Sequence, residues 1–234
     1  MGMAFSNSVP GATGPAPNRR IGWPGQKHLF FGLLALMYAY VFWKNESFLF
    51  RPDDPYWLRI ETFKWWLLPH GVTAGIALLL GPLQFSDRLR RRYAWFHRIA
   101  GRFYVAGVML GAPLGIYIQY FEERMGGTRS FTLAAAVDAF LWMLTTGMAL
   151  MYIRQGKVQL HRQWMTRSFA CAIIFIQVRV IVGLTGWIQH IEAVVWTCVA
   201  MAIPLADLVL QWQESRRGRA IPPKAPLAER MPAV

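Results

Sequence analysis

The sequence predicts an all-α membrane protein, a six-transmembrane-helix bundle with both termini cytoplasmic. Of its 234 residues, 55% are hydrophobic and only 16% are charged, a composition too apolar for an ordinary soluble domain. The apolar residues gather in runs close to the ~20 residues that a helix needs to cross a bilayer. In chain order these runs cover residues 28–43, 65–85, 103–121, 131–153, 168–188 and 193–212.

The first run is the shortest, because Lys44 and Glu46 follow it and make the stretch up to Phe50 amphipathic. We expect that stretch to lie at the membrane interface. The chain before the first run mixes Gly, Pro, Ser and Asn without periodicity, and the chain after the last run is basic and rich in Pro. The predicted organisation is therefore a disordered segment 1–26, a membrane domain 27–213 and a disordered basic tail 214–234.

The orientation follows from the distribution of Lys and Arg, which are retained on the cytoplasmic side of short loops. With the N-terminus inside, the inner segments hold 18 basic residues and 3 acidic ones, whereas the outer loops hold 6 basic and 7 acidic. This asymmetry predicts a multi-pass membrane protein with both termini on the cytoplasmic side. The net charge of +13 then indicates anionic lipid headgroups as the partner, since no basic stripe suggests nucleic acid.

Charged residues inside the predicted spans are informative, because each needs a partner at bilayer depth. Asp138 in the fourth run and Arg179 in the fifth run lie at similar distances from the outer surface. His70 in the second run is within a few residues of the same depth. We expect these three side chains to form a buried polar cluster. It would be either a structural ion pair between two spans or a site for a ligand or cofactor.

Small residues follow one helical face in two of the runs. In the second run the face contains His70, Thr73, Ala74, Ala77, Gly81 and Gln84, and in the third it contains Gly101, Tyr104, Gly107, Gly111 and Gly115. Such faces permit the close approach of another helix or of a flat cofactor. The pattern leaves both alternatives open.

Two histidines enter the membrane from the same predicted side in similar surroundings. His97 comes with Arg98 and Arg102, and His161 comes with Arg162 and Arg167. Two helices side by side would bring the imidazoles to one depth, as the ligation of a b-type haem iron requires, with the arginines on the haem propionates. The alternative is that both histidines contact lipid headgroups or helix-end carbonyls.

The chain resembles the bacterial membrane-protein family catalogued as domain of unknown function 2306, from about His70 to Trp212. The resemblance rests on His70, Gly81-Pro82-Leu83-Gln84-Phe85, His97-Arg98, Gly101-Arg102, Tyr104, His161-Arg162, Trp164-Met165, Arg167-Ser168-Phe169-Ala170 and Arg179. This family implies a multi-pass protein of the bacterial cytoplasmic (inner) membrane. It marks these residues without assigning a reaction. The layout is also similar to that of six-helix di-haem cytochromes b, although the fourth run contains no histidine.

Two classes of function remain open. One is a haem b electron-transfer protein with His97 and His161 on the iron and a quinone or another redox carrier as partner. The other is a non-enzymatic membrane subunit, or a small-ligand-binding or transport protein, built on His70, Asp138 and Arg179. Motifs typical of metalloproteases, phosphate-binding loops and serine hydrolases are absent from the sequence.

Overall fold

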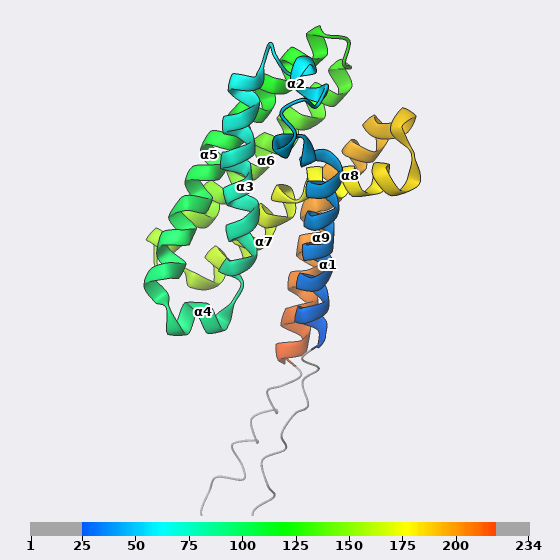
Figure 1. Cartoon of the computed structure of the whole chain (residues 1–234). Helices are drawn as coiled ribbons and strands as arrows, with labels where there is room; N and C mark the ends of the chain where they lie inside the picture. Colours follow the sequence, from blue (N-terminus) through cyan, green and yellow to red (C-terminus); the bar gives the residue numbers. More distant parts are fainter. Residues whose placement is uncertain (1–24, 219–234) are drawn as a thin grey trace, which may run out of the picture.

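The computed structural model describes residues 25–218, and these form helices without strands (Figure 1). In chain order they are α1 (Gly25–Asn45), η1 (Ser47–Phe50), α2 (Tyr56–Arg59), α3 (Lys64–Gln84), α4 (Asp87–Arg92), α5 (Ala94–Arg124), α6 (Arg129–Arg154), α7 (Val158–Ala172), α8 (Ile174–Thr185), η2 (Ile188–His190) and α9 (Ile191–Gly218). The all-α prediction is confirmed for this part of the chain. The predicted disordered segments lie almost entirely outside the described residues.

Five helical segments are long and apolar enough to cross a membrane. They are α3, α5, α6, the α7–α8 pair and the segment from η2 through α9. Among the described residues, α1 has the length of a span but does not reach the same hydropathy. The structure therefore supports an integral membrane protein with five candidate spans, and the sixth span stays a prediction.

The helix bounds differ from the predicted runs at three places. α5 begins at Ala94, so His97 lies inside the helix and not before it. α9 continues to Gly218, beyond the predicted start of the tail at residue 214. The predicted fifth span is divided into α7 and α8, which meet at Ile173 (φ −92°, ψ −1°).

The helices form an elongated bundle in which α3 packs along α5, α6 packs on α5 and α7, and α9 packs on α7 and α8. α1 contacts α8 and is joined to α3 by a hydrogen bond of 3.0 Å from the Tyr38 hydroxyl to the Leu78 carbonyl oxygen. The α4 helix lies at one end of the bundle together with the start of α1 and the end of α9 (Figure 1). We call this the α4 end, and the opposite end, which carries α2, the α2 end.

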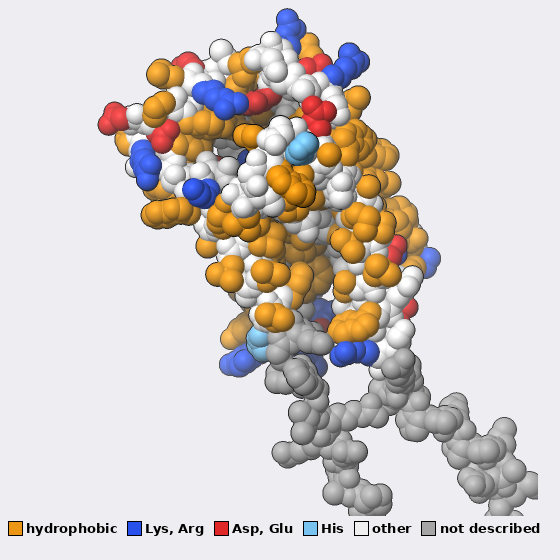
Figure 2. Space-filling model, turned by 90° about the vertical axis from the view of Figure 1, so that its right-hand side faces the viewer, with side chains coloured by type: hydrophobic (Ala, Val, Ile, Leu, Met, Phe, Trp, Pro, Cys, Tyr) orange, Lys and Arg blue, Asp and Glu red, His pale blue; other side chains and the backbone are white. Residues whose placement is uncertain are grey.

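The surface has the distribution of side chains expected of a protein in lipid. Hydrophobic side chains cover the middle of the face shown in Figure 2, and Lys, Arg, Asp and Glu gather towards its two ends. Exposed tryptophans and tyrosines occur near both ends: Trp43, Trp65 and Trp187 near the α2 end, and Tyr93, Trp95 and Trp212 near the α4 end. Aromatic residues of this kind mark the two membrane–water interfaces.

The small residues of the second and third runs face each other and bring α3 and α5 into close contact. A Cβ at Gly107 would lie 2.6 Å from the Thr73 carbonyl oxygen, and one at Gly111 would lie 3.1 Å from the Thr73 hydroxyl. The Ala77 side chain is fully buried at this contact. Of the two alternatives that the sequence left open, the structure supports helix packing for these faces.

Candidate functional site

His97 and His161 lie on the inward faces of their helices at the α4 end. On α5, His97 shares a face with Gly101, Tyr104 and Val108, which follow at steps of four, three and four residues, and both Tyr104 and Val108 are fully buried. On α7, His161 is followed on the same face by buried Met165. The two imidazoles lie close enough to interact electrostatically.

The ring of His161 is held by a backbone carbonyl. Its Nδ1 lies 2.9 Å from the Ala149 carbonyl oxygen on α6. A carbonyl oxygen only accepts, so Nδ1 carries the proton and the lone pair is on Nε2. Histidines that ligate metals are usually oriented by such a bond. His161 is thus prepared to offer Nε2 as a ligand.

The ring of His97 is in a different situation. Its Nδ1 is buried and has no hydrogen-bond partner among the described residues, and the Nε2 of nearby Gln84 is in the same condition. Buried polar atoms are rarely left unpaired. The Gln84 side chain also covers Gly101, whose Cβ position would be 3.4 Å from Oε1. The part of the small-residue face at Gly101, one turn from His97, is therefore covered by Gln84.

The arginines named from the sequence are arranged unequally. Arg98 and Arg102 are exposed, because they point away from the face that carries His97. Arg162 lies 3.9 Å from the Asp87 carboxylate, which also binds Arg90 at 2.7 Å. Arg90 was not anticipated from the sequence, yet it lies near enough to His97 to interact with it electrostatically. This end of the bundle is positively charged around the two histidines.

The set of possible metal ligands around the two histidines is small. No group of three or more His, Cys, Asp or Glu side chains assembles within residues 25–218, so an ion held by protein ligands alone is not supported. A haem iron needs only one or two protein ligands, since the porphyrin supplies four nitrogens. The unpaired Nδ1 of His97 and the free Nε2 of His161 are compatible with that requirement.

A buried network of hydroxyl groups joins α5, α6 and α7 next to the histidines. Tyr104 Oη and Thr146 Oγ1 each lie 2.7 Å from Ser168 Oγ, and Trp142 Nε1 donates to Tyr104 Oη at 3.3 Å. All four side chains are at least 93% buried. The sequence had marked Ser168 only through the family resemblance, and it had placed Tyr104 on the face of small residues in the third run. The structure shows that their hydroxyl groups are hydrogen-bonded to each other.

We expect Tyr104→Phe to lower the free energy of unfolding by about 1–2 kcal/mol, because it leaves the Trp142 N–H and the Ser168 hydroxyl with one partner fewer. Thermal unfolding of the purified protein in detergent measures the effect. Tyr117→Phe is the control, since Tyr117 is 41% exposed and its hydroxyl makes no hydrogen bond with the described residues. Equal melting temperatures for the two variants would contradict a stabilising role for the network.

The predicted cluster of His70, Asp138 and Arg179 is not assembled in the way the sequence suggested. Arg179 forms its ion pair with Glu46, at 3.4 Å, and not with Asp138. Asp138 is buried on α6, its Oδ1 has no hydrogen-bond partner among the described residues, and it interacts electrostatically with Cys171 of α7. The reason is rotational: Arg179 points from α8 towards α1, whereas Asp138 faces α7.

His70 is the third member of that predicted cluster and makes its contacts with α5. Its Nδ1 lies 2.9 Å from the Gly111 carbonyl oxygen, and its ring covers Gly115, where a Cβ would be 3.0 Å from Cε1. Like His161, it therefore keeps its lone pair on Nε2. His70 is also within electrostatic range of Arg179 and Glu46.

Comparison with known proteins identifies a family for this chain. Searches of curated proteins and of solved structures found no match. The family model described as predicted membrane protein (DUF2306) matches residues 67–210, which include α5 to α8 and most of α3 and α9. The chain belongs to this family of predicted membrane proteins.

Proposed function

We propose that this protein is a b-type cytochrome of the bacterial cytoplasmic membrane, in which His97 and His161 would hold the iron of one haem at the α4 end. The observation that carries the proposal is a pair of inward-facing imidazoles within electrostatic range of each other. One ring is fixed and has a free Nε2, and the other has a buried Nδ1 without a hydrogen-bond partner among the described residues. A haem held there would supply one-electron transfer through its iron.

The residues around the pair support the proposal in two further ways. Ala149 fixes the tautomer and the direction of the His161 ring, which removes the need to reorganise it on binding. Arg90 and Arg162 supply positive charge to which propionates could bind, in competition with Asp87. Arg98 and Arg102 are exposed nearby and remain available for the same role. A quinone or another redox carrier would be the electron partner.

The absorption spectrum of the purified protein tests the proposal. We expect a red sample with a Soret band that shifts when dithionite is added. Overexpressed protein can be purified without haem when the cells make less haem than protein. The purified protein should therefore also be titrated with haemin in detergent. A sample that stays colourless after expression and also fails to give a stoichiometric low-spin spectrum with haemin would contradict the proposal.

We further propose that the α4 end is cytoplasmic, because α4 carries the basic cluster Arg88, Arg90, Arg91 and Arg92. It lies at the same end as the start of α1 and the end of α9 (Figure 1). A fluorescent or β-galactosidase reporter fused after Val234 is expected to be active. Alkaline phosphatase inserted at Gly126, between α5 and α6, is expected to be active, because this connection would lie outside the cytoplasm and the enzyme is active only after export. The reverse pattern would contradict this orientation.

A further inference from the structure

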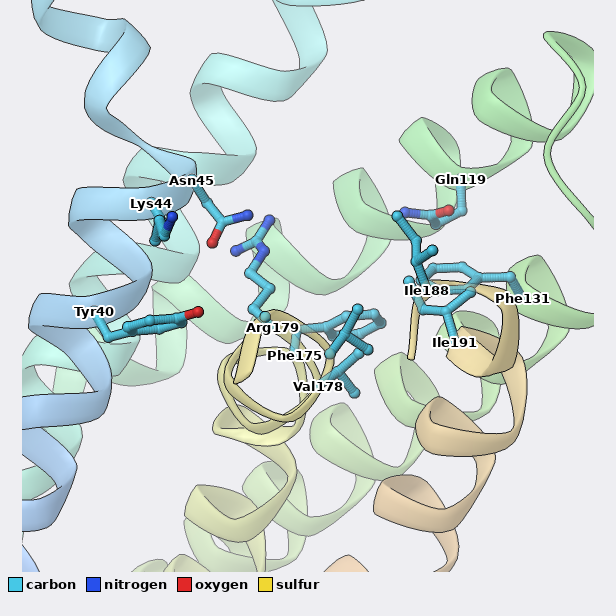
Figure 3. A pocket seen from close by; sticks show the side chains of 12 residues that line it. Tyr40, Lys44, Asn45, Gln119, Phe131, Phe175, Val178, Arg179, Ile188 and Ile191 are labelled. Carbon is cyan, nitrogen blue, oxygen red and sulfur yellow. The ribbon is translucent and has the colours of Figure 1, made fainter. Parts of the chain in front are cut away.

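A cavity of about 430 Å³ opens near the α2 end, away from the two histidines (Figure 3). It lies between α1 on one side and α8, α6 and the start of α9 on the other, with Gln119 of α5 at its edge. Its apolar walls are formed by Phe131, Phe175, Val178 and Ile191. The volume falls within the ~300–1,000 Å³ of typical small-molecule sites.

Hydrogen-bond donors are concentrated around this cavity. The side chains of Tyr40, Lys44, Asn45, Gln119 and Arg179 all line it. Arg179 projects from α8 towards Asn45 (Figure 3) and makes one ion pair, with Glu46. Within the described part of the chain, the other four side chains have no hydrogen-bond or ion-pair partner. The cavity therefore presents several unused donors to any molecule that enters it.

The charge of the cavity is positive. Lys44 and Arg179 contribute two positive charges and Glu46 one negative charge, which leaves a balance of +1. The contact with Glu46 uses one of the two terminal nitrogens of Arg179, so other N–H groups remain to bind an anion. The five donor side chains could make more hydrogen bonds than the two oxygens of a carboxylate accept. A phosphate has more acceptor oxygens, so these donors favour a phosphate over a carboxylate.

Two residues that line the cavity follow directly after exposed tryptophans. Trp43 precedes Lys44 by one residue, and Trp187 precedes the lining residue Ile188; the two tryptophans are 73% and 53% exposed. Exposed tryptophans occupy the membrane–water interface. A site at this level that combines cations with aromatic and aliphatic walls matches a molecule with an anionic head and an apolar chain.

We propose that this cavity binds the phosphate headgroup of a membrane amphiphile. Lys44 and Arg179 hold the phosphate, Asn45 and Gln119 donate to its remaining oxygens, and the start of the apolar chain lies against Phe175 and Ile191. The site is independent of the haem proposal, because it is built from α1, α8 and the start of α9 near the α2 end, whereas the histidines lie at the α4 end.

Calorimetric titration of the purified protein in a non-ionic detergent tests the site. The probes are a short-chain phosphatidic acid, the diacylglycerol with the same chains, and inorganic phosphate. We expect saturable binding of phosphatidic acid and affinities at least tenfold weaker for the other two. Equal affinity for inorganic phosphate would overturn the amphiphile as ligand, and equal affinity for the diacylglycerol would overturn recognition of the phosphate.

Variants of the Arg179–Glu46 pair make the test specific. Arg179→Gln and Lys44→Gln are expected to weaken phosphatidic acid binding about tenfold or more, because each removes a charge-assisted hydrogen bond. Glu46→Gln removes the competing carboxylate and should strengthen binding by about two- to fivefold, the effect of a partly exposed ion pair. Lys64→Gln is the matched control, since Lys64 binds Glu61 at 2.7 Å and does not line the cavity.

The opposite signs at one ion pair separate binding from folding. Loss of the ion pair alone would lower the stability of both the Arg179→Gln and the Glu46→Gln proteins. Only the proposed site predicts that Glu46→Gln binds phosphatidic acid more tightly. If Arg179→Gln does not fold, the Glu46→Gln/Arg179→Gln protein, which carries no unpaired charge at the pair, takes its place. The proposal would be overturned if Lys44→Gln left the affinity for phosphatidic acid unchanged and Glu46→Gln did not increase it.

Discussion

Replacing Gly107 with valine is expected to prevent the assembly of the bundle. A Cβ at this position would be 2.6 Å from the Thr73 carbonyl oxygen, and the atom it meets belongs to the backbone of α3. A flexible side chain could turn away, but a helix backbone cannot, so α3 and α5 would have to separate. These two helices form the most extensive contact in the described structure. Even Gly107→Ala is expected to destabilise by about 1–3 kcal/mol, as overpacking does.

Size-exclusion chromatography and thermal unfolding in detergent measure this effect. The matched control is Gly75→Ala on α3, since a Cβ at Gly75 meets nothing within 4 Å. In that variant the better helix propensity of alanine acts alone, and stability should stay equal or rise. Equal melting temperatures for Gly107→Ala and Gly75→Ala would contradict the close approach of α3 and α5 at Gly107.

The same interface indicates what the sequence could predict and what it could not. The positions of the small residues repeat at helical spacing, so the sequence correctly predicted which face of each helix permits close approach. Spacing along one helix contains no information about the partner. A helix backbone and a flat cofactor need the same absence of side chains, and only the contact between Gly107 and Thr73 distinguishes them.

The error at Arg179 has a related cause. Counting residues along a helix gives depth in the membrane, and by depth alone Asp138 was a suitable partner. Pairing also depends on rotation about the helix axis, and the division of the fifth span at Ile173 made that rotation unpredictable from the spacing. The signal for Glu46 was available, because it is an acidic residue just beyond the first run, near the depth of the outer end of the fifth.

Gln84 and Arg90 were missed as neighbours of His97 for another reason. The sequence placed Gln84 on a face of small residues and counted Arg90 among the basic residues of the inner segments, and each assignment describes one part of the chain at a time. The short α4 helix returns the chain from α3 to α5 and brings both side chains towards the α4 end of α5. Contacts that depend on a turn of this kind require the fold.

Replacing His161 with alanine is expected to abolish haem binding. The proposed bond to iron uses Nε2 of this residue, and the Ala149 carbonyl that orients the ring offers no substitute ligand. His97→Ala is expected to have the same effect on the low-spin spectrum, because a single remaining imidazole leaves the iron five-coordinate and high-spin. The absorption spectrum after haemin titration measures both variants, with helicity from circular dichroism as the check on folding.

His28→Ala and His190→Ala are the matched controls, since both histidines are exposed and lie away from the inward faces of α5 and α7. Their spectra should equal that of the unaltered protein. His70→Ala is more informative, because His70 also keeps a free Nε2 but lies against Gly111 and Gly115, far along α5 from His97. Loss of the low-spin spectrum in His70→Ala, with His97→Ala and His161→Ala unchanged, would move the haem to the other half of the membrane and contradict the site at the α4 end.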